Sequence, residues 1–297
     1  MDDLARVEAS APELSAAMPQ QAATDAQAVA LWLHGRPART ERESRREVAA
    51  FLAAVGNPLP VVTLGDVQAY TDRRRHLSPA TQARTINALR SLFRFLHTIG
   101  YLPFNVALPV KPPAVKNTLA ERILSESDVY RLLHRVEGNP RNYALLLLAY
   151  ASGGRVSELA GLKWRDVQPR GDAGQVTIFG KGGKTRIVLL PVAAWRKLQE
   201  LGPGAPDAPV FRSRAGGHLY TVQVWRIIRK AARDAGILAD VSPHFLRHAH
   251  ASHALDRQAP IHLVQQTLGH ASLQTTSKYT HARPNDSSGR YLGLGEL

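Results

Sequence analysis

The stretch SPHFLRH, residues 242–248, carries the first part of the pattern that decides the fold of this chain. Ser242 followed by Pro243 is typical of a helix N-cap and the first helical position. On such a helix His244 and Arg247 are three residues apart, so they share one face near the positive end of the helix dipole. The stretch therefore predicts a binding place for an anion such as phosphate.

The stretch TLGHASLQTTSKYTHA, residues 267–282, carries the second part. Gly269 is typical of a helix stop, and it places His270 directly after that stop. Ser272 then predicts the N-cap of a further short helix, which would carry Tyr279. The stretch thus supplies a histidine at a helix stop and a tyrosine on a short helix.

The stretch ASGGRVSELAGLKW, residues 151–164, adds a third part. Gly153 and Gly154 allow a sharp turn that presents Arg155 at the start of a short helix. Cleavage of a phosphodiester without a metal needs a nucleophile, fixed cations on the non-bridging oxygens, and an acid for the departing alkoxide. The sequence has candidates for all three.

Together these motifs resemble the tyrosine recombinase (phage integrase) family over residues 121–281. Six positions match the family pattern in chain order: Arg155 in GRVSEL, Lys181 in GKGGKTR, His244 and Arg247 in HFLRH, His270 in LGH and Tyr279 in YTH. Any one of these strings is common by chance, but six in order are not. The resemblance implies a mainly α fold: a helical, SAM-like core-binding domain, then an α+β catalytic domain that is mostly helical with a small antiparallel sheet.

The resemblance implies a chemistry in which Tyr279 attacks the scissile phosphate, giving a 3′-phosphotyrosyl link and a free 5′-hydroxyl. Because a free tyrosine has a pKa near 10, His244 is the candidate base or hydrogen-bond partner of its hydroxyl. Arg155 and Arg247 would stabilise the pentacoordinate state, since a guanidinium offers a planar fork of donors. His270 is expected to donate to a non-bridging oxygen.

The acid for the 5′-oxygen is expected in the turn GKGGK, residues 180–184. Lys181 is the candidate, because neighbouring arginines would lower its pKa, and Lys184 in the same turn is a rival. Glu158, one turn after Arg155, is expected to orient that arginine without contacting the phosphate itself. An ordinary exposed helix position is the alternative for Glu158.

The chain divides by pattern into five segments. We expect a flexible N-terminal tail, a helical core-binding domain that binds DNA, a proline-rich linker, the catalytic domain and a C-terminal tail, at residues 1–22, 23–108, 109–121, 122–282 and 283–297. Strand patterns occur only in QVTIF, residues 175–179, and TRIVLL, residues 185–190, which predict a hairpin. The clearest helix opens at Ser78 and Pro79 and stops at Gly100.

The net charge of +14 makes nucleic acid the leading class of partner. Two basic helical faces are the candidate DNA-binding surfaces, and a solvated face is the alternative for the one in the first domain. Their residues are Arg84, Arg90 and Arg94 in the first domain, and Arg226, Arg229, Lys230 and Arg233 in the second.

The composition narrows the remaining classes of chemistry and compartment. The absence of cysteine excludes disulfides, thiolate catalysis and cysteine-ligated zinc. The longest apolar run is too short to span a bilayer and no signal peptide is evident, so we expect a cytoplasmic protein without membrane contact. A histidine-based zinc site from His244, His248, His250 and His253 is the alternative to metal-free chemistry, but no HExxH motif supports it. The family implies no metal and no other cofactor.

Within the family the compact layout is most similar to the Xer type, which resolves chromosome or plasmid dimers; phage, transposon and integron enzymes stay open. The resemblance implies specific double-stranded DNA as substrate and a Holliday junction in a homo-tetramer or hetero-tetramer on paired sites. A type IB topoisomerase and a catalytically silent DNA-binding protein are the two competing readings.

Overall fold

The computed structural model describes residues 20–180, 183–238 and 240–279 of the chain. Both predicted tails lie largely outside these residues, and Lys181 lies outside them too. The chain divides into two compact units, one ending at Lys116 and the other beginning at Asn117, a division that falls within the predicted linker. Each unit is described by itself.

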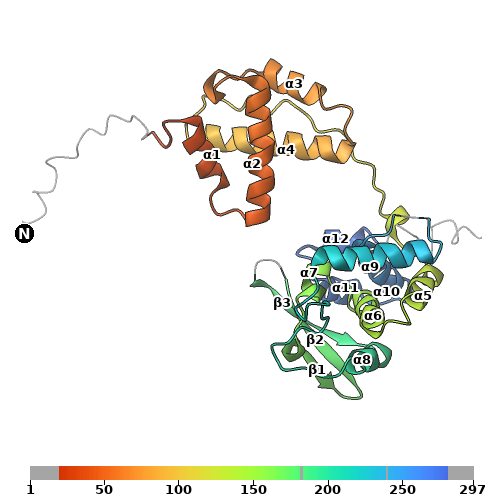
Figure 1. The fold of residues 1–297 in the computed structure, drawn as a ribbon. Helices are drawn as coiled ribbons and strands as arrows, with labels where there is room; N and C mark the ends of the chain where they lie inside the picture. Colours follow the sequence, from red (N-terminus) through yellow and green to blue (C-terminus); the bar gives the residue numbers. More distant parts are fainter. Residues whose placement is uncertain (1–19, 181–182, 239, 280–297) are drawn as a thin grey trace, which may run out of the picture. The chain divides into compact units, whose positions relative to one another are not determined.

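The first unit is a cluster of four α-helices: α1 (Asp25–Leu33), α2 (Ala38–Val55), α3 (Leu64–Asp72) and α4 (Pro79–Thr98), shown in red to yellow in Figure 1. Its core contains an aromatic group, in which Phe51 makes edge-to-face contacts with Tyr70 and Phe93. Helix α4 begins as predicted, because Ser78 Oγ accepts a hydrogen bond from the backbone N–H of Thr81.

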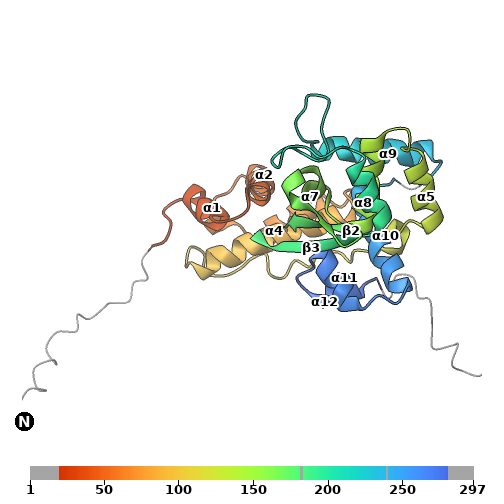
Figure 2. The ribbon, with the colours of Figure 1, turned by 90° about the horizontal axis from the view of Figure 1, so that it is seen from below.

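The second unit contains eight α-helices, among the described residues, with one small sheet at the side of the helices (Figures 1 and 2). The helices are α5 (Glu126–His134), α6 (Pro140–Ser152), α7 (Val156–Ala160), α8 (Val192–Gln199), α9 (Thr221–Asp234), α10 (Pro243–Asp256), α11 (Ile261–Leu268) and α12 (Leu273–Ser277). The central helix α6 is buried over most of its surface, including Leu145, Leu146 and Leu148. Because α10 packs along α6, the pattern read from residues 242–248 lies at the centre of this unit.

The sheet is antiparallel and has the order β1-β2-β3, formed by β1 (Val167–Arg170), β2 (Ala173–Phe179) and β3 (Thr185–Leu190). Strand β1 corrects the prediction of a two-stranded hairpin, and β2 begins earlier than predicted. Strand β1 was missed because its sequence, VQPR, is polar and contains Pro169. An edge strand tolerates a proline, since only one of its sides must pair. With these corrections, the expected mainly α fold with a small antiparallel sheet is confirmed.

A close contact with α8 and a row of buried side chains fix the sheet against the neighbouring helices. Trp195 of α8 lies on Gly174 of β2, where an added Cβ would come within 2.1 Å of the indole ring. On the same strand Val176 and Ile178 are buried, and in β3 the buried positions are Val188 and Leu190. Figure 2 shows β3 close to α11, the helix that leads into the site.

No helix in the described ranges is long and apolar enough to cross a membrane.

Candidate active site

The turn between α6 and α7 places Arg155 and depends on glycine. Gly153 ends α6 in the left-handed region, with φ of 58°. A Cβ at this position would lie 2.6 Å from Leu268 and 2.9 Å from His250, so the backbone approaches too closely for any side chain. The chain then extends through Arg155, which is the N-cap residue of α7. The predicted turn and short helix are therefore present.

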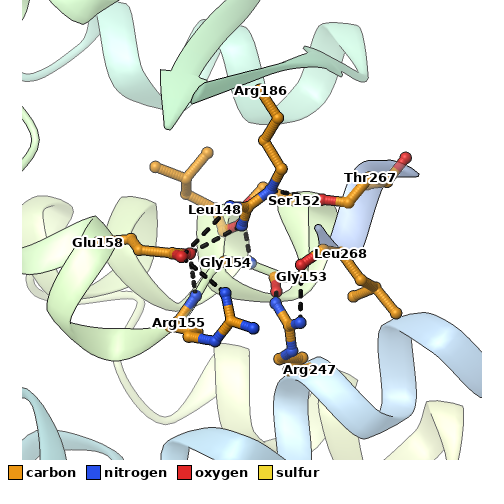
Figure 3. Close-up of polar contacts among 10 residues, drawn as sticks. All are labelled: Leu148, Ser152, Gly153, Gly154, Arg155, Glu158, Arg186, Arg247, Thr267 and Leu268. Carbon is orange, nitrogen blue, oxygen red and sulfur yellow. Dashed lines mark hydrogen bonds and ion pairs between the residues drawn. The ribbon is translucent and has the colours of Figure 1, made fainter. Parts of the chain in front are cut away.

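Glu158 is the hub of a buried network of arginines, shown in Figure 3. Its side chain is 5% exposed and accepts from the backbone N–H of Arg155 at 2.8 Å and from Arg155 Nη1 at 2.9 Å. Arg186 Nη2 donates to Glu158 Oε2 at 2.7 Å, the oxygen that also accepts from the backbone N–H of Arg155. Burial raises the pKa of Glu158, but the hydrogen bonds from Arg186 and Arg155 outweigh it and hold the pKa below its usual value.

Arg186 is a member of this network that the sequence analysis did not single out. It lies in β3 on the face of Val188 and Leu190, which is the buried face of the strand. Its Nε donates to the carbonyl of Thr267 at 2.7 Å, so it ties β3 to the end of α11 (Figure 3). The signal was available, since an arginine at a core-facing strand position needs a buried partner.

Arg247 lies at the bottom of the site and is 4% exposed. Its Nη1 donates to the carbonyl of Gly153 at 2.6 Å, and its Nη2 donates to the carbonyl of Leu268 at 2.7 Å (Figure 3). These carbonyls belong to the ends of α6 and α11, so one guanidinium fastens two helix termini. Burial, followed by the charge of Arg155, lowers the pKa of Arg247 to about 10.

Tyr279 lies just beyond α12 and not on it, which corrects the prediction. The helix is short and has the predicted cap, with Ser272 Oγ accepting from the backbone N–H of Gln274. The Tyr279 ring is 6% exposed and packs in a small apolar cluster with Val264 and Leu268. Burial raises the pKa of Tyr279, and the charge of Arg247 opposes that rise.

The hydroxyl of Tyr279 meets the ring of His248, which is a second correction. The distance from this oxygen to His248 Nδ1 is 2.8 Å. We expected His244 as the hydrogen-bond partner, but the histidine that reaches the phenol is one helical turn further along α10. The His244 ring lies 6.2 Å from that of His248. Burial, followed by the charge of Arg247, lowers the pKa of His244.

His270 also contacts the Tyr279 ring. The two rings are stacked, with centroids 6.4 Å apart and an interplanar angle of 5°. His270 Nδ1 is within hydrogen-bond distance of Thr276 Oγ1, at 2.9 Å. Burial, followed by the charges of Arg247 and Arg155, lowers the pKa of His270 to about 4.

An open cleft of about 710 Å³ borders the two histidines of α10. His244 and His248 line it, together with Arg122 from the start of the unit and Ser242 at the N-cap of α10. The cleft therefore opens at the positive end of α10.

The turn of residues 180–184 carries the two lysine candidates, and one of them lies in the described residues. Lys184 is exposed, and its carbonyl accepts from the backbone N–H of Gly180 at 2.7 Å. Lys181 is outside the described residues.

The predicted DNA-binding arginines and lysine lie on the surfaces of two helices in different units. Arg84 and Arg94 of α4 are exposed and Arg90 is half-buried.

The basic face of α9 includes Arg226 and Arg233, both exposed, while its other two cations form surface ion pairs, Arg229 with Asp240 and Lys230 with Asp234. The sequence analysis missed Trp225, whose ring lies 4.6 Å from the Arg229 guanidinium.

The alternative of a histidine zinc site finds no support in the described part of the chain, where no group of three or more possible ligands comes together. Three of these histidines, His248, His250 and His253, are in hydrogen bonds. His250 Nδ1 is 2.8 Å from the carbonyl of Tyr150, and His253 Nδ1 is 2.8 Å from the hydroxyl of the same tyrosine.

The sequence is similar to that of known recombinases. The model of the phage integrase family matches residues 122–286. The chain is 36% identical over 249 residues to tyrosine recombinase XerC of Xanthomonas campestris pv. campestris (strain B100), covering 80% of this chain and 76% of that protein. It is 38% identical over 224 residues to tyrosine recombinase XerD of Mycobacterium leprae (strain TN), covering 69% of this chain and 70% of that protein.

Comparison with solved structures shows a similar fold. A lambda integrase tetramer bound to a Holliday junction matches with a TM-score of 0.70 at 19% identity, covering 88% of this chain and 78% of that one.

Proposed function

This chain belongs to the phage integrase family, and from that premise we propose that it is a tyrosine-type site-specific DNA recombinase, as its XerC and XerD relatives are named. In this proposal the chain cleaves and rejoins DNA strands through a 3′-phosphotyrosyl intermediate on Tyr279. Among the family's types, the Xer type is favoured by identities of 36% and 38% to XerC and XerD.

The observation that carries the proposal is the convergence of the predicted side chains in one unit. Arg155, Arg247 and His270 come from three separate stretches of sequence, yet both arginines lower the pKa of His270, so the three lie within electrostatic reach. Tyr279 stacks on His270. In-line attack on a phosphate needs a positioned nucleophile and fixed positive charges, and the phenol of Tyr279 lies among side chains that can supply both.

We assign the cation roles to Arg155 and Arg247. Arg247 donates two hydrogen bonds to the carbonyls of Gly153 and Leu268, and these fix the plane of its guanidinium. The carboxylate of Glu158 holds the guanidinium of Arg155 through a hydrogen bond of the same kind. Donors held in place before the substrate arrives cost no reorganisation when negative charge develops on the phosphate. Glu158 and Arg186 therefore serve as positioning residues.

In the chemical step the Tyr279 oxygen forms a bond to phosphorus while the bond from phosphorus to the 5′-oxygen breaks. His270 donates to a non-bridging oxygen, and His244, at the mouth of the cleft, assists at the same phosphate. Lys181 protonates the 5′-oxygen, with Lys184 as the alternative acid from the same turn. The phosphotyrosyl link keeps the bond energy, so a 5′-hydroxyl can reverse the step without a metal or a nucleotide.

The substrate is double-stranded DNA with a specific recombination site. The helical unit before residue 109 and the basic face of α9 provide the candidate contacts to DNA, through Arg84, Arg90, Arg94, Arg226, Arg229, Lys230 and Arg233. We further propose a homo-tetramer or hetero-tetramer on two paired sites, since the lambda integrase structure that shares the fold is a tetramer on a Holliday junction. The proposed compartment is the cytoplasm, where the chromosome or plasmid substrate lies.

The test uses a nicked duplex that the protein binds, in which the nick lets the cleaved product diffuse away and so traps the intermediate. Wild type is expected to give an SDS-resistant protein–DNA adduct in EDTA, and Tyr279→Phe none. A topoisomerase would instead relax supercoiled DNA without regard to sequence. Bound DNA without any adduct would favour the catalytically silent reading.

A further inference from the structure

The hydrogen bond of the Tyr279 hydroxyl identifies a side chain that no family motif above assigns. Tyr279 must lose its phenolic proton when it attacks phosphorus, and its pKa is raised by burial. A hydrogen-bond acceptor on that oxygen is therefore required. The described residues place one such group there, His248 Nδ1 at 2.8 Å.

The neighbouring candidates are less suited to accept this proton. His270 Nδ1 is engaged with Thr276 Oγ1 at 2.9 Å. His244 lines the cleft, and its ring centroid lies 6.2 Å from that of His248. Arg247 has donors and no acceptor. His248 alone among these four side chains has a ring nitrogen within hydrogen-bond distance of the phenol.

We propose that His248 is a catalytic residue that accepts the proton of Tyr279 during DNA cleavage and returns it during rejoining. The inference rests on the proposed function and names the proton acceptor of the same site. Before attack the imidazole is neutral, with Nδ1 accepting from the phenol and the proton on Nε2.

The proton balance of the step is complete. As the Tyr279 oxygen bonds to phosphorus, its proton moves to His248 Nδ1, and the ring becomes an imidazolium. The 5′-oxygen leaves with a proton from the lysine of the 180–184 turn. Rejoining reverses both transfers: the 5′-hydroxyl gives its proton back to the lysine, and His248 returns its proton to the phenol.

The surroundings of His248 link this proton transfer to DNA binding. Burial, followed by the charges of His244 and Arg247, lowers its pKa to about 4, with smaller contributions from Arg122 and His270. The ring is therefore a weak base in the free protein. A phosphate bound by the arginines adds negative charge to this cluster of cations and raises the basicity of the ring. The phenol is thus deprotonated when a phosphate is present to be attacked.

The experiment measures single-turnover cleavage of the nicked duplex by His248→Asn and His248→Ala. Asparagine keeps a hydrogen-bond acceptor near the position of Nδ1 but cannot take up a proton. We expect both variants to bind the DNA like wild type and to cleave roughly 100-fold more slowly, the usual contribution of a general base. The matched control is His253→Asn, since His253 makes the same kind of contact with Tyr150 at 2.8 Å.

A second substrate separates the acceptor from the acid. A 5′-bridging sulfur leaves as a thiolate and needs no proton, so it should restore cleavage by Lys181→Ala and not by the His248 variants. Wild-type cleavage by His248→Asn, or its recovery on the sulfur substrate, would overturn the assignment. If wild type itself forms no adduct, the proposed function fails instead. Matching circular dichroism spectra of the variants show that any loss is not a folding defect.

Discussion

Helix α10 carries two histidines that each meet a tyrosine hydroxyl through Nδ1 at 2.8 Å, yet their surroundings differ. Tyr279 and His248 lie among cations, and the charge of Arg247 lowers the pKa of the phenol against the effect of burial. Tyr150 and His253 lie beside Glu126, whose charge adds to the effect of burial and raises the pKa of Tyr150. The same contact is thus suited to nucleophilic attack in one place and to holding a neutral pair in the other. Chemistry is decided by the charges around the contact.

The largest expected difference concerns the two phenols. Tyr279→Phe should form no SDS-resistant adduct, because no oxygen remains to bond to phosphorus. Tyr150→Phe should cleave like wild type and lose about 1–3 kcal/mol of unfolding free energy, because His253 Nδ1 loses its partner in a buried site. Adduct formation and urea unfolding measure the two effects. An adduct formed by Tyr279→Phe would show that Tyr279 is not the nucleophile.

The arginines next to the two pairs come second. Arg247→Lys should reduce cleavage by roughly 10²–10³-fold, since an ammonium cannot replace a guanidinium that binds two carbonyls and faces phosphate. Arg257→Lys should leave the rate unchanged, because Arg257 is an exposed partner of Glu126. The rate constants on the nicked duplex decide this. Equal losses in both variants would mean that the need for a guanidinium is not specific to the surroundings of Tyr279.

The carboxylates give a smaller difference. Glu158→Gln should slow cleavage about tenfold, a size typical of residues that support a site from behind, because Arg155 loses its ionic partner. Glu126→Gln should not affect cleavage. DNA affinity measured in parallel should be unchanged in both, which distinguishes a misplaced arginine from weaker binding. A normal rate for Glu158→Gln would reduce Glu158 to a structural ion pair.

The smallest effect is on the pH dependence of stability. The folded-state pKa of His248 is about 4, against an ordinary value of 6.5, so between these values the unfolded chain binds more protons. Stability from this group is complete above pH 6.5 and is lost as the pH falls toward 4. His248→Asn should therefore flatten the pH profile of urea unfolding. His253→Asn should flatten it less, because Glu126 and Asp256 oppose the lowering of its pKa.

The sequence predicted the local geometry of the site better than its contacts. The Gly153 turn, the cap at Ser272 and the stop at Gly269 follow from backbone rules, and each is present. His248 and Arg186 were missed as partners because their contacts join residues far apart in the chain. A spacing rule reports which side chains share a face, whereas the partner across that face depends on tertiary packing.

The same limit explains the errors in the fold. Strand β1 has neither apolar alternation nor β-branched enrichment, and it is a strand because β2 offers it an edge to pair with. Tyr279 was expected on the short helix that Ser272 caps, but α12 ends at Ser277.

The shortness of α12 has a consequence for how the phenol is held. A helix of five residues has no stability of its own in water, so this one persists by docking through Thr276 and Tyr279. Helix and tyrosine therefore open and close as one cooperative unit, at a free energy below that of global unfolding. The exposure of the Tyr279 hydroxyl then depends on the equilibrium between the docked and the open form of α12. Hydrogen exchange at the α12 amides measures that equilibrium in the absence of DNA.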